Sequence, residues 1–338
     1  MKKAVILGKY KAELVKVPDP EPKEDWVLVK VQAAPMCTEY KAFIRGQNHD
    51  YLGHEAVGEV VAVAQPGRVK VGDRVVVMPG YPCGKCPLCI SGEFIHCENI
   101  YDFAKFVGSP EGSATMAQYL LKPSWLLPLI PEGVSYEHAS LALCALGPTF
   151  GAFDLMNVDS FDTVLITGAG PVGLGGIINA RFRGARVIVA QFHPWRVKKA
   201  KELGAEAVIN PRNKDCVEQI KSLSNGIGVD KAVDCSGTVA AHRICIDATR
   251  RKGHVAFVGE CGEETPLRIS SDMIRKGLTL HGSWHYNLSR FPEIMKVIQH
   301  SPLIDQLISH IFPLSKIQEA FEVSASHDCA KIILRPWE

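Results

Sequence analysis

Two patterns of apolar residues divide the chain. Up to about residue 150, short apolar runs such as Val27–Val31, Val57–Val63 and Val75–Met78 are separated by Gly, Pro and Asp. This pattern is typical of β-strands joined by turns. It predicts a β-rich, barrel-like domain.

From about Thr163 to Trp284, six apolar segments recur every 20 to 25 residues: TVLITG, ARVIVA, AEAVIN, DKAVDC, HVAFVG and LTLHGS. Most of the intervening segments, such as Arg196–Leu203 and Thr238–Arg250, have helical patterns. Strands this apolar must be covered on both faces, which favours a parallel sheet with crossover helices. We therefore expect a doubly wound sheet with strand order 3-2-1-4-5-6.

The last part of the chain, after about Tyr286, alternates helix and strand patterns. Helices are expected at Phe291–Gln299 and Ser315–Val323, and strands near His310–Phe312 and at AKIILRP. These elements could extend the parallel sheet or return to the first domain.

Composition excludes several classes of protein. With 338 residues, 46% hydrophobic and 22% charged, the chain is long and apolar enough for about two folded domains and is not disordered. A net charge of +2 lacks the basic excess typical of nucleic-acid binding. No apolar run reaches about 18 residues, and the N-terminus returns to charge too soon for a secretory signal. We expect a cytoplasmic protein without nucleic-acid or membrane partners. Its odd count of 11 cysteines argues against a disulfide framework.

A glycine-rich turn follows the first apolar segment of the α/β region, in the order Gly168, Ala169, Gly170, Pro171, Val172 and Gly173. The three glycines allow a tight turn, close approach of the backbone to a pyrophosphate, and close packing of the following helix. The helix N-terminus adds free N–H groups for the anion. In this strand–turn–helix context, the motif predicts a dinucleotide site.

The residue at the end of the second strand, where NAD sites usually carry an acid, is Gln191. Glutamine can bond a ribose hydroxyl but neither repels nor neutralises a 2′-phosphate. Arg196 follows within a few residues and is either a phosphate or ribose contact or a solvated helix residue. The choice between NAD and NADP stays open, with a slight preference for NAD.

A cluster of four cysteines, Cys83, Cys86, Cys89 and Cys97, has the spacing C-x2-C-x2-C-x7-C in a loop rich in Gly and Pro. Four thiolates can close a tetrahedral shell around Zn²⁺, which leaves no open position and indicates a structural role. An iron–sulfur cluster and unligated core cysteines are the alternatives.

Cys37, the pair His54-Glu55 and Cys144 also stand out in the first part of the chain. Cys, His and Cys form a set of three protein ligands, the number that a catalytic zinc uses while keeping one position open. By spacing alone this signal is weak, because scattered Cys and His residues are usually ordinary core residues.

With these motifs in order, the chain resembles the zinc-dependent medium-chain dehydrogenase/reductase family, which includes alcohol, sorbitol and threonine dehydrogenases. The matching segments are Cys37, GHE with GEV at Gly53–Val60, VGDRV at Val71–Val75, the four-cysteine lobe, GAGPVG, Arg196–Ala205, DCSG at Asp234–Gly237 and the final strand. The resemblance implies a GroES-like β-barrel catalytic domain from residues 1–150 and 286–338. A Rossmann NAD(P)-binding domain at 151–285 would lie between these segments, with the active site in the cleft.

The resemblance also implies roles for individual residues. Cys37, His54 and Cys144 match the ligands of the catalytic zinc, and Glu55 matches a carboxylate that approaches the metal in some members. Family members often carry a proton-relay hydroxyl two residues after the first cysteine ligand. This chain has Glu39 there, beside Thr38, and either residue could serve; we favour Glu39 as the proton acceptor.

The function implied is hydride transfer between an alcohol, polyol or sugar and NAD or NADP in a homodimer or homotetramer with two Zn²⁺ per chain. The alternatives are a zinc-free quinone or enoyl reductase on the same scaffold, and a non-catalytic nucleotide-binding relative.

Overall fold

The computed structural model describes residues 1–338, and they form two compact units. Unit 1 contains Met1–Leu143, Asn287–Gln299 and Ile308–Glu338; unit 2 contains Cys144–Tyr286 and His300–Leu307. Unit 2 thus begins before the expected boundary at residue 150, because the helix that starts at Gly147 packs on unit 2 strands. Residues 300–307 also belong to unit 2, because the 3₁₀ helix Ile304–Leu307 contacts the helix Pro171–Phe182 of that unit.

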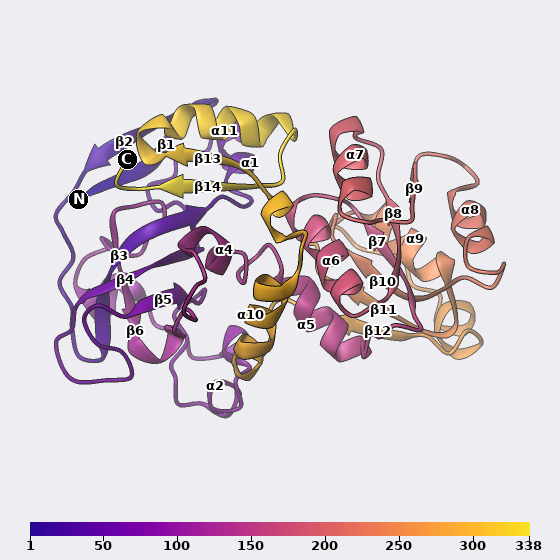
Figure 1. Cartoon of the computed structure of the whole chain (residues 1–338), viewed down its shortest axis with the longest axis horizontal. Coiled ribbons are helices and arrows are strands. Elements are labelled where there is room, and N and C mark those ends of the chain that lie inside the picture. Colours follow the sequence, from indigo (N-terminus) through magenta and orange to yellow (C-terminus); the bar gives the residue numbers. More distant parts are fainter. The chain divides into compact units, whose positions relative to one another are not determined.

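The main sheet of unit 1 combines strands from both ends of the chain (Figure 1). The order is β13-β14-β3-β4-β5, and β6 also pairs with β3. The strands are β3 (Trp26–Pro35), β4 (Ala56–Ala62), β5 (Arg74–Val77), β6 (Tyr119–Pro123), β13 (Ile308–Pro313) and β14 (Lys331–Arg335). Since β14 pairs antiparallel with β3 and belongs to unit 1, the final strand returns to the first domain.

The sheet of unit 1 is curved around a core but does not close into a barrel. The hairpin of β1 (Lys2–Gly8) and β2 (Lys11–Lys16) forms a separate ribbon. Isolated bridges such as Lys3–Ala117 and Ile6–His49 connect it to other parts of unit 1, and it also contacts the helices α1 (Tyr40–Arg45) and α11 (Ile317–Ser326). The GroES-like β-rich fold is confirmed, and its strands form open mixed sheets.

The core of unit 1 follows from the alternation of apolar side chains along its strands. Val27, Val29 and Val31 of β3 point inward together and are at most 2% exposed. They join a cluster that includes Phe321 and Ile332, so the C-terminal residues complete the core. The helices of this unit are α1 (Tyr40–Arg45), α2 (Pro87–Ile90), α3 (Phe103–Val107), α4 (Tyr136–Ser140), α10 (Phe291–His300) and α11 (Ile317–Ser326).

Unit 2 contains the expected doubly wound parallel sheet. Its strands are β7 (Thr163–Thr167), β8 (Arg186–Ala190), β9 (Ala207–Ile209), β10 (Val229–Asp234), β11 (Thr249–Phe257) and β12 (Thr279–Gly282). The order β12-β11-β10-β7-β8-β9 is the predicted 3-2-1-4-5-6 arrangement read from the other edge. The Rossmann prediction is therefore confirmed.

Helices cover both faces of this sheet, as its apolar strands require. Helices α5 (Gly147–Met156) and α6 (Pro171–Phe182) pack on each other and on the sheet, and α7 (Pro194–Glu202) contacts α6. Helices α8 (Cys216–Ser222) and α9 (Val239–Ala248) also pack on each other, with α9 against β7, β10 and β11.

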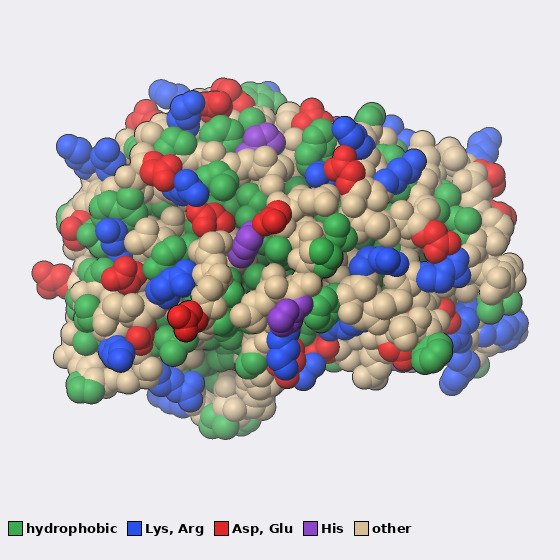
Figure 2. Space-filling view, in the orientation of Figure 1, with side chains coloured by type: hydrophobic (Ala, Val, Ile, Leu, Met, Phe, Trp, Pro, Cys, Tyr) green, Lys and Arg blue, Asp and Glu red, His purple; other side chains and the backbone are tan.

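No helix in the structure has the length and apolar character needed to cross a membrane. Figure 2 shows acidic and basic side chains interspersed over the visible face, as the net charge of +2 implies.

Candidate functional site

The four-cysteine loop brings its sulfur atoms together around one point. The ligand atoms of Cys83, Cys86, Cys89 and Cys97 all lie within 4.8 Å of one another. The Sγ–Sγ distances are 3.5 Å for Cys86–Cys89, 3.8 Å for Cys86–Cys97 and 3.6 Å for Cys83–Cys97. Ligands at about 2.3 Å from a tetrahedral zinc would be about 3.8 Å apart, whereas a disulfide would need about 2.05 Å. The loop therefore fits a tetrahedral metal.

Backbone N–H groups favour the thiolate form of Cys83, whereas burial raises the pKa of Cys89 in the same loop. The amides of Cys83 and Asn99 each donate to Cys97 Sγ at 3.3 Å. A hydrogen bond from the Lys85 amide is the main reason that the pKa of Cys83 falls to about 6. Since the thiolate is the form that binds a metal, the lowered pKa of Cys83 favours metal binding by this loop.

A second group of donors consists of Cys37, His54, Glu55 and Cys144, whose ligand atoms also lie within 4.8 Å of one another. Cys37 lies in the segment between β3 and α1, while His54 and Glu55 immediately precede β4. Cys144 directly follows Leu143, the last residue of the first segment of unit 1. Two sulfurs, one imidazole and one carboxylate are ligand types that suit zinc.

Glu39 holds two members of this group in place. Its Oε1 lies 3.0 Å from His54 Nδ1, and its Oε2 accepts a hydrogen bond of 2.8 Å from the Cys37 amide. Burial would raise the pKa of Glu39, but the hydrogen bond and charge of His54 outweigh it and lower the pKa. With Nδ1 facing Glu39, His54 presents Nε2 as its ligand atom, an arrangement common among metal-binding histidines. Thr38, the other relay candidate, is exposed.

Glu55 has a partner that the sequence analysis missed. Its Oε1 lies 2.5 Å from Nζ of Lys331 in β14 and 3.9 Å from His54 Nε2. Burial is the largest influence on Glu55 and raises its pKa to about 7, although the Lys331 ammonium opposes this effect. The only sequence signal was a lysine inside the apolar segment AKIILRP.

The glycine-rich turn connects β7 to α6 and begins the helix at Pro171. Gly168 has φ +81°, and a Cβ there would lie 2.9 Å from Ser236 Cβ. At Gly173 a Cβ would lie 1.9 Å from the Gly168 carbonyl oxygen, which only glycine avoids. A Cβ on Gly170 would meet nothing closer than Arg196 Nη1 at 3.9 Å. The backbone beside Gly170 and Val172 is thus open to an anion, with Arg196 within reach.

The buried carboxylate of Asp234, at the end of β10, supports this turn. It accepts hydrogen bonds from Thr167 Oγ1 at 2.7 Å and from the amides of Ser236 and Gly237 at 3.1 and 3.0 Å. Thr167 immediately precedes Gly168, and Ser236 packs against Gly168. The DCSG motif thus fixes the backbone of the turn, a role that its sequence does not reveal.

Gln191 is placed at the end of β8, but its side chain turns back toward the backbone. Its Oε1 accepts hydrogen bonds from the amides of Phe192 and His193 at 2.8 and 3.0 Å, and the residue is 7% exposed. Only its Nε2 hydrogens remain as donors to a ligand. Nearby, the Arg212 guanidinium lies 3.6 Å from the centre of the Phe192 ring.

Comparison with known proteins gives the same family for both units. Residues 23–132 match the Alcohol dehydrogenase GroES-like domain, and residues 171–300 match the Zinc-binding dehydrogenase family. The chain is 30% identical to sorbitol dehydrogenase of Bacillus subtilis (strain 168), covering 99% of this chain and 97% of that protein. It is 32% identical to L-threonine 3-dehydrogenase of Pyrococcus horikoshii, with 96% and 95% covered.

Among solved structures, alcohol dehydrogenase TADH from Thermus sp. ATN1 superposes with a TM-score of 0.89 at 26% identity, covering 99% of each chain. The motifs, both folds and these likenesses extend over nearly the whole sequence. The chain therefore belongs to the zinc-type medium-chain dehydrogenase family.

Proposed function

We propose that this protein is a zinc-dependent dehydrogenase that transfers a hydride between an alcohol or polyol and NAD or NADP. The observation that carries the proposal is the convergence of Cys37, His54, Glu55 and Cys144, with ligand atoms within 4.8 Å of one another. The glycine-rich turn of the same chain supplies a dinucleotide site. A metal site and a nicotinamide site together support oxidation of a hydroxyl group.

The protein's residues would divide the work at this site. Cys37, His54 and Cys144 would hold the zinc, which as a Lewis acid favours the alkoxide form of the substrate. Glu39 orients the imidazole of His54. Glu55 adds a negative charge beside the ligands, and Lys331 balances and positions that charge.

The proton of the alcohol requires a separate path. Both oxygens of Glu39 are already engaged, one facing His54 and the other accepting from the Cys37 amide. This geometry supports a positioning role for Glu39 and leaves the exposed hydroxyl of Thr38 as the better relay group. We therefore assign the proton relay to Thr38 rather than to Glu39.

The four-cysteine loop would hold a second zinc with a structural role. Its sulfur–sulfur distances of 3.5 to 3.8 Å support a closed tetrahedral shell, with no position for substrate. Two donor sets of this kind favour a zinc enzyme over the zinc-free reductase and the non-catalytic alternative.

For the cofactor, we propose NAD with NADP also accepted. The end of β8 has no carboxylate at Gln191 to repel a 2′-phosphate. Two cations lie in this region, Arg196 near Gly170 and Arg212 over the ring of Phe192. The side-chain amide hydrogens of Gln191 can donate to a ribose 2′-hydroxyl or to a 2′-phosphate, which supports weak discrimination between NAD and NADP.

The substrate class is an alcohol, polyol or sugar, since the similar proteins include enzymes named for sorbitol and for an alcohol.

We also propose a cytoplasmic homodimer or homotetramer. Six of the 11 cysteines are proposed zinc ligands, which must stay reduced to bind the metal. The edge strand β12 offers backbone groups to a second copy, which light scattering can test.

The function is tested by incubating the purified protein with NAD or NADP and a panel of alcohols, polyols and sugars. Reduction of the nicotinamide by at least one of them, dependent on the metal, is expected. Metal-independent reduction of a quinone or enoyl substrate would instead support the zinc-free alternative.

A further inference from the structure

A basic pocket lies in unit 2, apart from the residues assigned above. Its volume is about 260 Å³, and it is lined by four cationic side chains, Lys221, Arg251, Arg275 and Lys276, together with Ile227, Thr249 and Ser271. None of the seven lining side chains is acidic. An excess of one charge around a concave surface raises the local concentration of ions of the opposite charge.

The pocket lies at the N-terminal ends of the strands of unit 2, whereas the glycine-rich turn lies at their C-terminal ends. Arg251 is near the start of β11, and Arg275 and Lys276 precede β12. The glycine-rich turn, in contrast, follows the carboxyl end of β7. Because these strands are parallel, all their N-terminal ends lie on one side of the sheet and all their C-terminal ends on the opposite side. A ligand in the pocket would therefore not compete with the cofactor.

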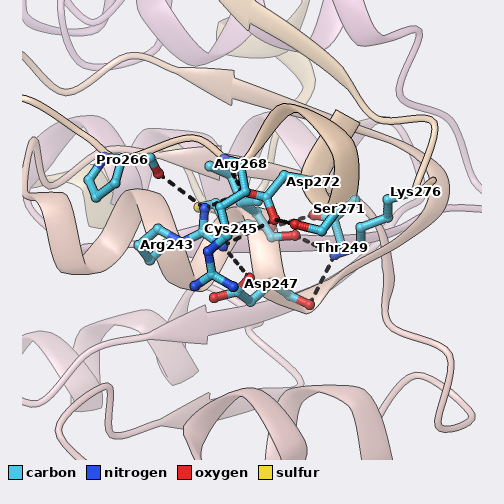
Figure 3. Close-up of polar contacts among 10 residues, drawn as sticks. Arg243, Cys245, Asp247, Thr249, Pro266, Arg268, Ser271, Asp272 and Lys276 are labelled. Atoms are coloured by element: carbon cyan, nitrogen blue, oxygen red, sulfur yellow. Dashed lines mark hydrogen bonds and ion pairs between the residues drawn. The ribbon is translucent and has the colours of Figure 1, made fainter. Parts of the chain in front are cut away.

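Two carboxylates close to the pocket, those of Asp247 and Asp272, form ion pairs with Arg243. Figure 3 shows Arg243 between Asp247 and Asp272; its guanidinium lies 2.5 Å from Asp247 Oδ1 and 2.7 Å from Asp272 Oδ2. The amide of Arg268 donates a further hydrogen bond to Asp272 at 2.9 Å. In contrast, none of the four pocket cations forms an ion pair within the chain.

Two of the cations are held by backbone carbonyls rather than by acids. Arg251 Nη1 donates to the Arg275 carbonyl at 2.8 Å, which fixes the guanidinium beside that loop. Lys276 Nζ donates to the carbonyls of Ile246 and Asp247 at the end of α9 (Figure 3). Such contacts orient the cations without cancelling their charge, so their remaining donors can bind an anion.

The main effect on Lys276 is burial, which lowers its pKa to about 8 against the opposing charge of Asp247. The charge of Asp272 also raises this pKa, while the neighbouring cations Lys221 and Arg243 lower it. A bound anion would relieve both the burial cost and this repulsion.

We propose that this pocket binds a small phosphate-type anion with several negative charges, of the size of pyrophosphate or a phosphate monoester. Arginine forks and lysine ammonium groups are the side chains that bind phosphate oxygens. The volume exceeds that of one phosphate group but is below that of most cofactor pockets. The site is independent of the proposed dehydrogenase reaction.

The test is calorimetric titration of the whole protein with pyrophosphate, inorganic phosphate and adenosine 5′-phosphate, with and without saturating NAD. We expect saturable binding of pyrophosphate that NAD leaves unchanged. R251Q and R275Q should each weaken it about 10-fold, the usual effect of losing one charge-assisted hydrogen bond. Comparing the three ligands distinguishes free phosphates from a nucleotide source.

The matched control is K252Q, which removes the same charge from the residue beside Arg251 without altering the pocket lining. It should keep wild-type affinity. The proposal is overturned if millimolar pyrophosphate shows no saturable binding at low salt, or if K252Q weakens binding as much as R251Q. Competition by NAD would also overturn it, since that result would place the anion at the cofactor turn. Circular dichroism verifies that each variant is folded.

Discussion

The carboxylate of Glu55 and the ammonium of Lys331 form a buried ion pair, with Oε1 2.5 Å from Nζ, between residues 276 positions apart. Both side chains are at most 1% exposed. The pair connects the start of β4, beside the proposed ligand His54, to the final strand β14. The C-terminal strand thus contributes directly to the charge balance of the proposed metal site.

Removal of one partner from this pair should be costly. Lys331→Met leaves the Glu55 carboxylate buried without its counter-ion, and breaking such a pair typically costs about 3–5 kcal/mol. Urea unfolding should show this loss, whereas the double variant Glu55→Gln with Lys331→Met should recover part of it. If the single variant is as stable as the wild type, the pair contributes nothing to folding.

The relay assignment is tested by two substitutions with different expected effects. Thr38→Val should depress alcohol oxidation by about 10²-fold or more, the scale for losing a proton-transfer group, while zinc content stays normal. Thr38→Ser should retain activity. Glu39→Gln should mainly weaken zinc binding, by about 10–100-fold, because His54 loses its orienting partner. An active Thr38→Val with an inactive, fully zinc-loaded Glu39→Gln would return the relay to Glu39.

The two donor sets should have separable roles. Cys86→Ser should lower zinc from two ions to one per chain and lower the melting temperature, but leave part of the turnover. Cys37→Ala should also remove one zinc yet abolish turnover in a folded protein. Elemental analysis and thermal unfolding measure these effects. Iron in place of zinc would contradict the assignment of the four-cysteine loop.

Cofactor selection should depend on Gln191. Gln191→Asp adds a negative charge at the end of β8, and its repulsion of a 2′-phosphate should raise the preference for NAD. The ratio of kcat/KM for NAD to that for NADP should rise at least about 10-fold, as a repulsion of about 1.4 kcal/mol implies. Gln191→Asn is the uncharged control. An unchanged ratio in Gln191→Asp would show that this position does not face the ribose.

Features that are local in sequence were predictable from the chain alone. The strand–turn–helix at Gly168–Gly173 and the four-cysteine loop each lie within a short segment, so residue types and spacing define them. The strand order of unit 2 also followed, because apolar parallel strands with crossover helices allow few topologies.

Relationships between distant segments were not predictable. Lys331 lies in an apolar strand, as Lys3 and Lys122 also do, so its sequence position does not single it out. Its partner depends on the register of β14 against β3. The role of Glu39 depends on the direction of its side chain rather than on its position after Cys37. Strands β1 and β2 pair with each other in a separate two-stranded sheet, and hydrophobic alternation cannot specify which strands pair.

Metal removal and restoration in one preparation of the protein tests whether hydride transfer depends on the proposed zinc. We expect two zinc ions per chain and alcohol-dependent reduction of NAD or NADP. That activity should be lost when a chelator removes the zinc bound by Cys37, His54 and Cys144, and should be recovered on adding Zn²⁺. Full turnover after complete loss of metal from that site would show that hydride transfer does not require this zinc.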